Sequence, residues 1–301
     1  MTAKVILNPY SNRWNSKARW AETEAALKAA GVEFELAVSE HKGHVIDLVE
    51  KAARDGFSPI IVTGGDGTIG DAVNGLARAA KSADEPLGPL GIMPTGSAND
   101  LVYNLGNPVD LTTAAKVIKG GKVRSIDLGK CNDSYFANNS AAGLEPYVTI
   151  KHEKIQNIKG IARYLLAAVQ AIMERPEWQA NIKWDGGEYN GPLTLVTVGN
   201  GPRTGGLFFM APHADLSDGK LTLAYGHRGT RLGMFMALPR AMKPRQGSYV
   251  EMDGMNEVHC TRVSIHLDHP SPAHTDGELF PKFVQDLEYS IQPGRLKILV
   301  P

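Results

Sequence analysis

Cysteine is scarce in this chain of 301 residues, which contains only Cys131 and Cys260. Two cysteines are too few for a disulfide framework, and neither belongs to a Cys-x-x-Cys pair of the zinc or thioredoxin type. The N-terminus also lacks a basic region followed by a long apolar segment and a small-residue cleavage site, because Lys4 leads directly into a short apolar run. We therefore expect a reducing, cytoplasmic setting.

An excess of either charge is absent as well. The 32 Lys and Arg residues balance 32 Asp and Glu residues, so the formal net charge is zero. A chain with no net charge has no overall electrostatic attraction to the phosphates of nucleic acids, and we expect no nucleic-acid partner. No window reaches the roughly 20 apolar residues that span a bilayer, since even segment 161–173 contains Arg163, Tyr164 and Gln170. The protein is expected to be soluble or to lie on a membrane surface.

The first 125 residues alternate short apolar runs with amphipathic segments, which is typical of βαβ units around a mostly parallel sheet. Strands are expected at 4–7, 33–37, 60–63 and 90–93. Ser16 is expected to cap a helix that ends at Gly31, and a second helix, containing Val45 and Ala52, is expected to end before Gly56.

From residue 126 to 301 the pattern changes. Short alternating runs at 193–198, 221–225, 263–267 and 296–300 are separated by Gly, Pro and Asp turns, which predicts mainly antiparallel β-structure. Helices are expected at about 155–174 and 230–242. We therefore predict an α/β domain over residues 1–125 and a β-rich domain over residues 126–301.

The most informative local sequence is the glycine-rich turn 64–68, Gly-Gly-Asp-Gly-Thr, which follows an apolar strand and opens a helix. Glycines permit close backbone approach, and N–H groups at a helix start attract anions, so this turn is expected to bind phosphate. Asp66 would repel phosphate unless it holds Mg²⁺, accepts a proton or orients a donor, which favours catalysis. A structural Asx-turn is the plain alternative.

The same turn matches the dinucleotide pattern Gly-x-Gly-x-x-Gly, but that fingerprint normally follows the first strand, so nicotinamide or flavin binding ranks second. A second polar loop, residues 93–100, also follows a strand, which puts it beside the glycine turn in an open α/β sheet. Thr95 or Ser97 is alternatively a helix cap. Ser97 lacks the flanking glycines of a hydrolase nucleophile.

These two loops, in this order, resemble those of the diacylglycerol kinase catalytic-domain family of lipid kinases, which includes sphingosine kinases and bacterial relatives. The similarity continues through residues 8–12, 138–145, 199–206, 214–219 and 276–278, and so covers nearly the whole chain. It implies a first domain similar to NAD kinases and phosphofructokinases, and a β-sandwich-like second domain. It also implies transfer of the γ-phosphate of ATP to a lipid hydroxyl with Mg²⁺, and diacylglycerol is the expected acceptor.

The resemblance implies a role for particular residues. ATP would bind between the two domains, in contact with Asn8, Pro9, Tyr10, Ser11, Asn12, Ser39, Gly64, Gly65, Asp66, Gly67, Thr68, Ser97 and Asn99. Glu278 would accept the proton of the attacking hydroxyl, and Asp66 would act near the phosphates and metal. A structural Mg²⁺ would be held by Asp215, Asp218 and the backbone carbonyl of Lys220. Which of Asp66 and Glu278 takes the proton stays open, because both could reach the same phosphate.

Three positions depart from the family pattern. Asn12 stands where Gly is usual, Ser97 where Thr is usual, and Lys220 where Leu is common. Asn12 tolerates left-handed dihedral angles and Ser97 keeps the hydroxyl, so ATP binding is expected to survive both changes. The charge of Lys220 would oppose a cation if its side chain turned inward, whereas a carbonyl ligand leaves the side chain free to point to water.

No acidic residue occurs between Asp218 and Glu251, although six basic residues lie there: Lys220, Arg228, Arg231, Arg240, Lys243 and Arg245. Apolar residues lie among them: Leu232, Met234, Phe235, Met236 and Leu238. This mixture suits an anionic membrane surface, and an ordinary docked helix with solvated charges is the equal alternative. We hypothesise a lipid-entry element and a peripherally membrane-associated enzyme.

Four histidines, His259, His266, His269 and His274, lie close together in sequence near Cys260, but their spacing matches no zinc pattern. Solvated or hydrogen-bonded imidazoles are expected. The resulting prediction is an ATP- and Mg²⁺-dependent lipid kinase. The alternatives are a kinase of a soluble alcohol or nucleotide on the same fold, and a non-catalytic nucleotide-binding sensor. The sequence is compatible with a homodimer and does not specify the oligomeric state.

Overall fold

The computed structural model describes residues 2–155, 158 and 161–301 and divides the chain into two compact units. Unit 1 comprises Met1–Leu128 and Gln292–Pro301, and unit 2 comprises Gly129–Ile291. This division differs from a single boundary near residue 125 because the last ten residues return to unit 1.

Unit 1 contains a parallel sheet with strand order β2-β1-β3-β4, extended by the end of β18. The strands are β1 (Ala3–Leu7), β2 (Phe34–Val38), β3 (Ile60–Gly64), β4 (Leu87–Pro94) and β18 (Val284–Leu299). All five residues of β3 are buried. A strand that is covered on both faces has little need of polar side chains, which explains its apolar run Ile60–Val62. The predicted parallel sheet is confirmed.

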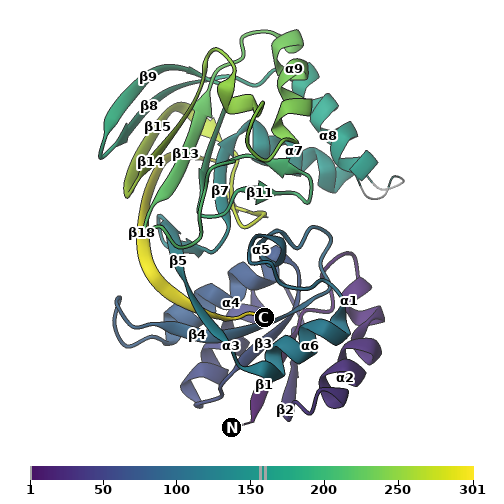
Figure 1. The fold of residues 1–301 in the computed structure, drawn as a ribbon. Coiled ribbons are helices and arrows are strands. Elements are labelled where there is room, and N and C mark those ends of the chain that lie inside the picture. The colour runs from purple at the N-terminus through teal and green to yellow at the C-terminus, as the bar shows by residue number, and fades with distance from the viewer. Residues whose placement is uncertain (1, 156–157, 159–160) are drawn as a thin grey trace. The chain divides into compact units, whose positions relative to one another are not determined.

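Helices cover this sheet (Figure 1). They are α1 (Asn15–Ala18), α2 (Trp20–Ala29), α3 (His44–Arg54), α4 (Asp66–Ala79), α5 (Asp100–Asn104) and α6 (Leu111–Gly120). Helices α2 and α6 share a core with β1, β3 and β4, while α3 and α4 pack on each other and on β3. Gly31 and Gly56 end helical segments at positive φ, as predicted.

Ser16 is not the predicted helix cap. It lies buried inside α1, and its hydroxyl is 2.5 Å from the hydroxyl of Thr95. Arg19 separates α1 from α2, so the expected single helix is two.

Unit 2 is a sandwich of two antiparallel sheets. One contains the end of β5 (Val123–Cys131), whose first six residues belong to unit 1, together with β6 (Ser134–Phe136), β8 (Trp178–Trp184), β9 (Gly187–Leu193), β15 (Arg262–Ser271) and the start of β18. The other has the order β14-β13-β10-β7-β16-β17. Its strands are β7 (Asn139–Gly143), β10 (Leu195–Gly199), β13 (Leu221–Gly226), β14 (Met255–Cys260), β16 (Ala273–Thr275) and β17 (Glu278–Leu279).

Alternate side chains of the two sheets form one core, with Val196 and Leu223 from one sheet and Ile265 and Leu287 from the other. The predicted antiparallel sandwich is therefore confirmed. A small hairpin, β11 (Arg203–Thr204) and β12 (Phe208–Phe209), and a 3₁₀ turn at Tyr249–Glu251 complete the described strands and turns of this unit.

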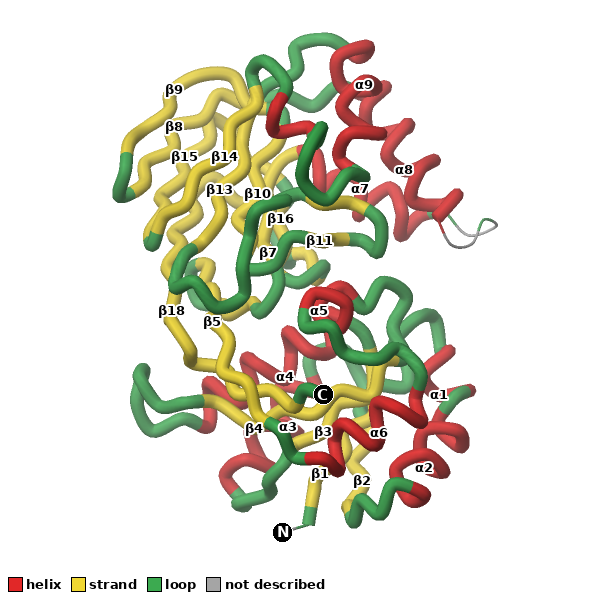
Figure 2. The backbone as a smooth tube through the Cα atoms, in the orientation of Figure 1, coloured by secondary structure: helices red, strands yellow, loops and turns green. Residues whose placement is uncertain are grey.

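Helices α7 (Leu144–Lys154), α8 (Ile161–Glu174) and α9 (Arg231–Ala241) lie together in unit 2 (Figure 2). Helix α8 begins later than the predicted residue 155, and residues 156, 157, 159 and 160 lie outside the described ones. Helix α7 was not predicted, because its sequence has no clear apolar face. Helix α9 was predicted closely: Thr230 caps it, and it continues through Pro239 to Ala241.

The apolar run predicted at 296–300 for the second domain belongs to unit 1. There Leu296 and Ile298 of β18 pair in parallel with β4, whereas residues 284–290 of the same strand pair antiparallel with β15 in unit 2. Alternation alone does not distinguish a parallel from an antiparallel partner, which explains the error.

Candidate functional site

Polar loops follow four neighbouring strands of unit 1. Residues 8–12 follow β1, Ser39 follows β2, the glycine turn follows β3, and residues 95–99 follow β4. Because parallel strands end at the same edge of a sheet, the structure brings all the predicted nucleotide-contacting residues to one edge of unit 1.

Asn8 joins the first loop to the glycine turn. Its Nδ2 donates to Thr68 Oγ1 at 3.0 Å, and its backbone N–H donates to the carbonyl of Thr63 at 3.1 Å. Its Oδ1 accepts the N–H of Tyr10 at 3.1 Å. Pro9 is buried and Ser11 half-buried beside it. The loop is therefore held in a fixed position by the turn that starts α4.

Ser39 is buried in the loop after β2. Its N–H donates to the carbonyl of Leu7 at 2.9 Å, and its hydroxyl donates to the carbonyl of His41 at 3.3 Å. The Tyr10 hydroxyl donates to the carbonyl of Glu40 in the same loop. These contacts connect the first two strand ends at the edge of the sheet.

The glycine turn and the 95–99 loop are in direct backbone contact. The N–H groups of Thr95 and Gly96 donate to the carbonyl of Gly64 at 3.0 and 3.1 Å. A Cβ atom added at Gly96 would lie 2.3 Å from the Cα of Gly65, and one added at Gly64 would lie 2.2 Å from Thr68 Oγ1. Glycine is therefore required here by protein packing as well as by any close ligand approach.

Asp66, half-buried, is the first residue of α4, and its Oδ1 accepts the N–H of Leu101 in α5 at 3.0 Å. Its carboxylate thus connects the glycine turn with α5, a longer reach than a local Asx-turn. Neither Thr95 nor Ser97 caps α5. Asn99 occupies the cap position with φ 51°, and its side-chain amide bonds to both the N–H and the carbonyl of Gly96.

Two of the three departures from the family pattern contact each other. Ser97 Oγ donates to Asn12 Oδ1 at 2.6 Å, and Asn12 adopts φ 51°, a left-handed angle that glycine usually supplies. The first loop therefore keeps the backbone conformation that glycine usually adopts there. The side-chain amide of Asn12 has a hydrogen-bond partner, Ser97, on the 95–99 loop.

In unit 2, the Asp276-Gly277 pair forms the two-residue turn between β16 and β17. Both residues have positive φ, 47° and 82°, as an Asp-Gly hairpin turn requires. The Asp276 carboxylate is buried and accepts the N–H groups of Ala137, Asn138 and Asn139 at 2.8 to 3.0 Å. Asp276 is therefore structural, whereas the neighbouring Glu278 is exposed on unit 2.

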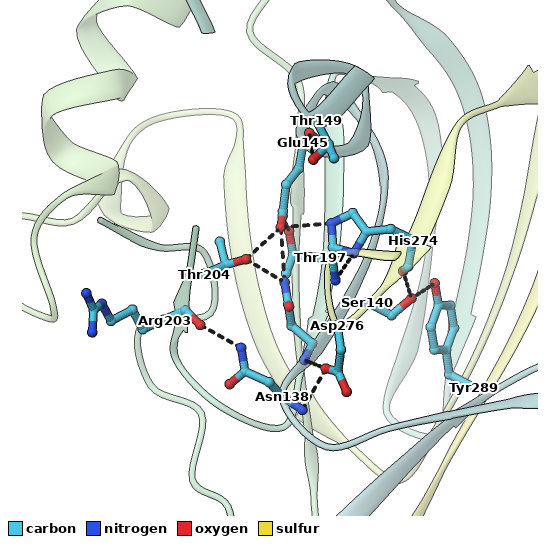
Figure 3. Close-up of polar contacts among 12 residues, drawn as sticks. Asn138, Ser140, Glu145, Thr149, Thr197, Arg203, Thr204, His274, Asp276 and Tyr289 are labelled. Atoms are coloured by element: carbon cyan, nitrogen blue, oxygen red, sulfur yellow. Dashed lines mark hydrogen bonds and ion pairs between the residues drawn. The ribbon is translucent and has the colours of Figure 1, made fainter. Parts of the chain in front are cut away.

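Glu145 is the acid that sequence reasoning did not single out (Figure 3). Its carboxylate accepts four hydrogen bonds, from His274 Nε2 (3.1 Å), Thr197 Oγ1 (2.7 Å), Asn139 Nδ2 (3.0 Å) and Thr204 Oγ1 (3.2 Å). Burial raises the pKa of Glu145, but the hydrogen bonds from His274, Thr197 and Asn139 outweigh this effect and hold the pKa below its usual range.

No local pattern could have found this cluster, because its members come from β7, α7, β10, β11 and β16. The only signal was that Glu145 ends the 138–145 motif. The same fold joins the 138–145 and 199–206 motifs: Asn200 Nδ2 donates to the carbonyl of Ala137 at 2.7 Å, and Asn138 Nδ2 donates to the carbonyl of Arg203 at 2.8 Å.

Asp215, Asp218 and Lys220 lie exposed in the loop before β13. Asp215 Oδ1 accepts the N–H of Ser217 at 2.9 Å, and Asp218 Oδ1 accepts the N–H of Lys220 at 2.9 Å. Two carboxylates and a backbone carbonyl are oxygen ligands of the kind that Mg²⁺ prefers. Among residues 2–155, 158 and 161–301, however, no group of three or more His, Cys, Asp or Glu residues could hold a metal ion.

The four histidines near Cys260 have separate partners. His259 contacts Thr222, His266 pairs with Asp286, His269 pairs with Asp268, and His274 contacts Glu145. Cys260 is buried in the sandwich core. The structure therefore does not bring these residues together.

The predicted lipid-entry residues divide into two sets. Leu232 and Met236 are 70% and 57% exposed on α9, whereas Met234 is buried and Leu238 packs on the core of β10, β13 and β14. Met234 is therefore corrected to a core residue. In the part of the chain that the structure describes, no helix has both the length and the apolar character to cross a membrane.

Comparison with known proteins identifies the family. Residues 2–131 match the diacylglycerol kinase catalytic domain, and residues 139–300 match the YegS C-terminal NAD kinase beta sandwich-like domain. A probable lipid kinase YegS-like protein of Chromohalobacter salexigens is 29% identical over 93% of this chain and 88% of its own length. A diacylglycerol kinase of Staphylococcus aureus is 30% identical over 78% of this chain and 74% of its own.

Solved structures show the same fold. The crystal structure of a putative diacylglycerol kinase from Bacillus anthracis has a TM-score of 0.80 at 23% identity, covering 100% of this chain and 97% of that one. The family matches span both units, and a kinase of this family is expected to use ATP as its phosphoryl donor. The chain belongs to the diacylglycerol kinase family and is a lipid kinase by that membership.

Proposed function

We propose that this chain transfers the γ-phosphate of ATP to the hydroxyl group of diacylglycerol in a Mg²⁺-dependent reaction. The observation that supports this most directly is the edge of unit 1, where Asn8, the glycine turn and the 95–99 loop contact one another. Phosphoryl transfer depends mainly on positioned phosphates and electrostatic stabilisation, which rigid backbone donors at a helix start provide.

The proposed step assigns a role to the start of α4, to Asp66 and to Glu278. The N–H groups at the start of α4 bind phosphate, with Asp66 beside them. The lipid oxygen forms a bond to the γ-phosphorus, the bond from that phosphorus to the bridging oxygen breaks, and ADP leaves. Glu278 accepts the hydroxyl proton, a role that suits its exposed carboxylate.

We propose Asp215, Asp218 and the backbone carbonyl of Lys220 as the ligands of a structural Mg²⁺. The exposed side chain of Lys220 supports this assignment, because it leaves the carbonyl as the only contribution of that residue. The bound ion would supply positive charge to this loop of unit 2.

The direct test is phosphate transfer from γ-labelled ATP to micelles containing diacylglycerol, a sphingoid base or phosphatidylglycerol, with and without Mg²⁺. We expect labelled phosphatidic acid, reduced about 100-fold or more in Asp66→Asn and Glu278→Gln. The exposed acids Asp84 and Glu188 provide matched controls, Asp84→Asn and Glu188→Gln, which should retain full activity. Label in the sphingoid base or phosphatidylglycerol but not in diacylglycerol, or intact ATP binding with no labelled product, would contradict the proposal.

We propose that the enzyme meets its substrate at an anionic membrane through α8 and α9. Leu232 and Met236 are exposed on α9 and Met173 on α8, and Arg231 Nε donates to the carbonyl of Met173 at 2.9 Å. Three further basic residues lie on or after α9: Arg240, Lys243 and Arg245. Adaptable apolar side chains beside cations suit the boundary of an anionic bilayer.

Sedimentation with vesicles of phosphatidylcholine containing phosphatidylglycerol tests this surface. Replacing Arg240, Lys243 and Arg245 with Gln should weaken binding at least about tenfold, since each basic residue contributes roughly 1 kcal/mol. The matched control replaces Lys81, Lys116 and Lys122, three exposed lysines of unit 1. Equal binding by the two triple variants would exclude α9 as the contact.

A further inference from the structure

The polar network of unit 2 contains a buried acid–base pair, Glu145 and His274, to which the proposed reaction assigns no role. The side chain of His274 is 2% exposed and that of Glu145 is 11% exposed, and 3.1 Å separates Nε2 from Oε1. Buried polar groups of this kind are costly unless each is fully hydrogen-bonded, so a pair retained here requires an explanation.

The second nitrogen of the His274 ring determines where its proton lies. The backbone N–H of Gly277 donates to Nδ1 at 3.4 Å. Because a backbone N–H can only donate, Nδ1 is the unprotonated nitrogen, and the neutral ring holds its proton on Nε2. Nε2 therefore donates to Glu145, whose carboxylate can only accept. Glu145 selects the tautomer of His274 that leaves Nδ1 available to Gly277.

The turn held in this way is the one that precedes Glu278. His274 contacts it at Gly277, and the carboxylate of Asp276 fixes it to the N–H groups of residues 137–139. Asn139 connects the two attachments, because its N–H donates to Asp276 and its Nδ2 donates to Glu145. The position of the Glu278 backbone is thus determined by contacts that converge on Glu145.

Two threonines complete the surroundings of the carboxylate. Thr197 of β10 donates to Oε2 and Thr204 of β11 donates to Oε1. With Asn139 and His274, these donors come from four different strands, so Glu145 cannot rotate away without losing several hydrogen bonds together. A carboxylate held on all sides is suited to fixing its neighbours in place.

We propose that Glu145 and His274 are positioning residues for phosphoryl transfer, fixing the Asp276-Gly277 turn so that Glu278 is presented to the attacking hydroxyl. This proposal rests on the proposed role of Glu278 as proton acceptor. Neither residue touches substrate in it, so both act on the rate of the chemical step and leave nucleotide binding unchanged.

Three substitutions separate the parts of this chain of contacts. Glu145→Gln removes the charge that orients His274. His274→Gln keeps a donor near the former Nε2 and loses the acceptor for Gly277, whereas His274→Asn keeps an acceptor near the former Nδ1 and loses the contact with Glu145. The control is His227→Gln, which removes a histidine from a partly buried pair with Glu177 at 3.0 Å elsewhere in unit 2.

Steady-state kinetics with ATP and diacylglycerol micelles, expressed per folded protein, provide the first measurement. We expect kcat to fall about tenfold to 100-fold in Glu145→Gln and His274→Gln with KM for ATP within about twofold of wild type. His274→Asn should recover part of the loss, and His227→Gln should retain full activity. A kcat close to wild type in folded Glu145→Gln, or a loss confined to KM for ATP, would overturn the proposal.

The nitrogen resonances of His274 in ¹⁵N-labelled protein provide a measurement that needs no activity, assigned by their absence in His274→Gln. We expect the Nε2–H tautomer in wild type and its loss in Glu145→Gln. An Nδ1–H tautomer in wild type would overturn the proposal even if Glu145→Gln did not fold. If the wild type shows the Nε2–H tautomer but has no lipid kinase activity, that result would instead refute the proposed function.

Discussion

Unit 1 and unit 2 build their polar sites in different ways. In unit 1 each loop directly follows a strand, and the loops meet through the backbone, as at Gly65 and Gly96. In unit 2 the site consists of side chains from distant segments, and Glu145 and His274 are 129 residues apart. The first arrangement depends on local sequence and the second on the completed fold, so the two should respond differently to substitution.

The largest effect is expected where backbones touch. Gly96→Ala places a Cβ 2.3 Å from the Cα of Gly65, and neither backbone can move without displacing a strand end. We expect a loss of about 2–3 kcal/mol in the free energy of unfolding together with loss of ATP binding. Chemical denaturation and nucleotide titration measure the two effects. Gly120→Ala is the control, because nothing lies within 4 Å of its added Cβ.

A somewhat smaller loss in the free energy of unfolding is expected for a substitution at Asp276. Asp276→Asn replaces a buried carboxylate that accepts three backbone N–H groups with an amide whose NH₂ cannot accept, at a cost of about 2 kcal/mol. Asp66→Asn keeps an oxygen for the N–H of Leu101, so its stability should stay within about 1 kcal/mol of wild type. If denaturation midpoints showed Asp66→Asn to be less stable than Asp276→Asn, the difference proposed between the two units would be wrong.

A smaller effect should appear in the pH dependence of stability. The pKa of Glu145 lies below its ordinary value of 4.5 in the folded protein. The carboxylate therefore stabilises the fold above that value, and this contribution is lost as pH falls through the folded-state pKa. We expect the difference in unfolding free energy between wild type and Glu145→Gln to shrink as pH falls below 4.5. A difference that grows on acidification would reverse the assigned sign.

The smallest expected signal is thiol reactivity, which reports on unit 2 alone because both cysteines lie there. Burial raises the pKa of Cys131 to about 11 and that of Cys260, with a smaller effect of the Asp185 charge, to about 12. At pH 8 a disulfide reagent should label the native protein at least about 100-fold more slowly than a free thiol. Asp276→Asn should accelerate labelling and Gly96→Ala should not, while rapid labelling of the native wild type would contradict the burial of both thiols.

Much of unit 1 could be predicted from the sequence because its information is local. Short apolar strands bounded by Gly and Asn, and a glycine turn after one of them, predicted the parallel sheet and the edge where Asn8, Asp66 and Ser97 gather. The error at Ser16 has a tertiary cause, since its hydroxyl bonds to Thr95 instead of capping a helix.

Less of the unit 2 site could be predicted. The resemblance to lipid kinases indicated Glu278, but nothing in the spacing connects Glu145 with Thr197 or His274, whose strands come to lie on either side of β7 only in the folded sheet. Helix α7 was missed for a related reason: its sequence has no clear apolar face, and its start is set by Gly143, the last residue of β7, at φ 87°. Contacts of this kind depend on strand order, which local patterns do not encode.

Strand β18 determines the order in which the chain can be completed on the ribosome. Its first residues join the unit 2 sheet beside β15, and only afterwards do Leu296 and Ile298 reach the edge of β4 in unit 1. Residues 1–128 are therefore translated before residues 292–301, which cover that strand edge, so the edge is exposed in the meantime. The sheet of unit 1 is therefore completed only after all of unit 2 has been synthesised.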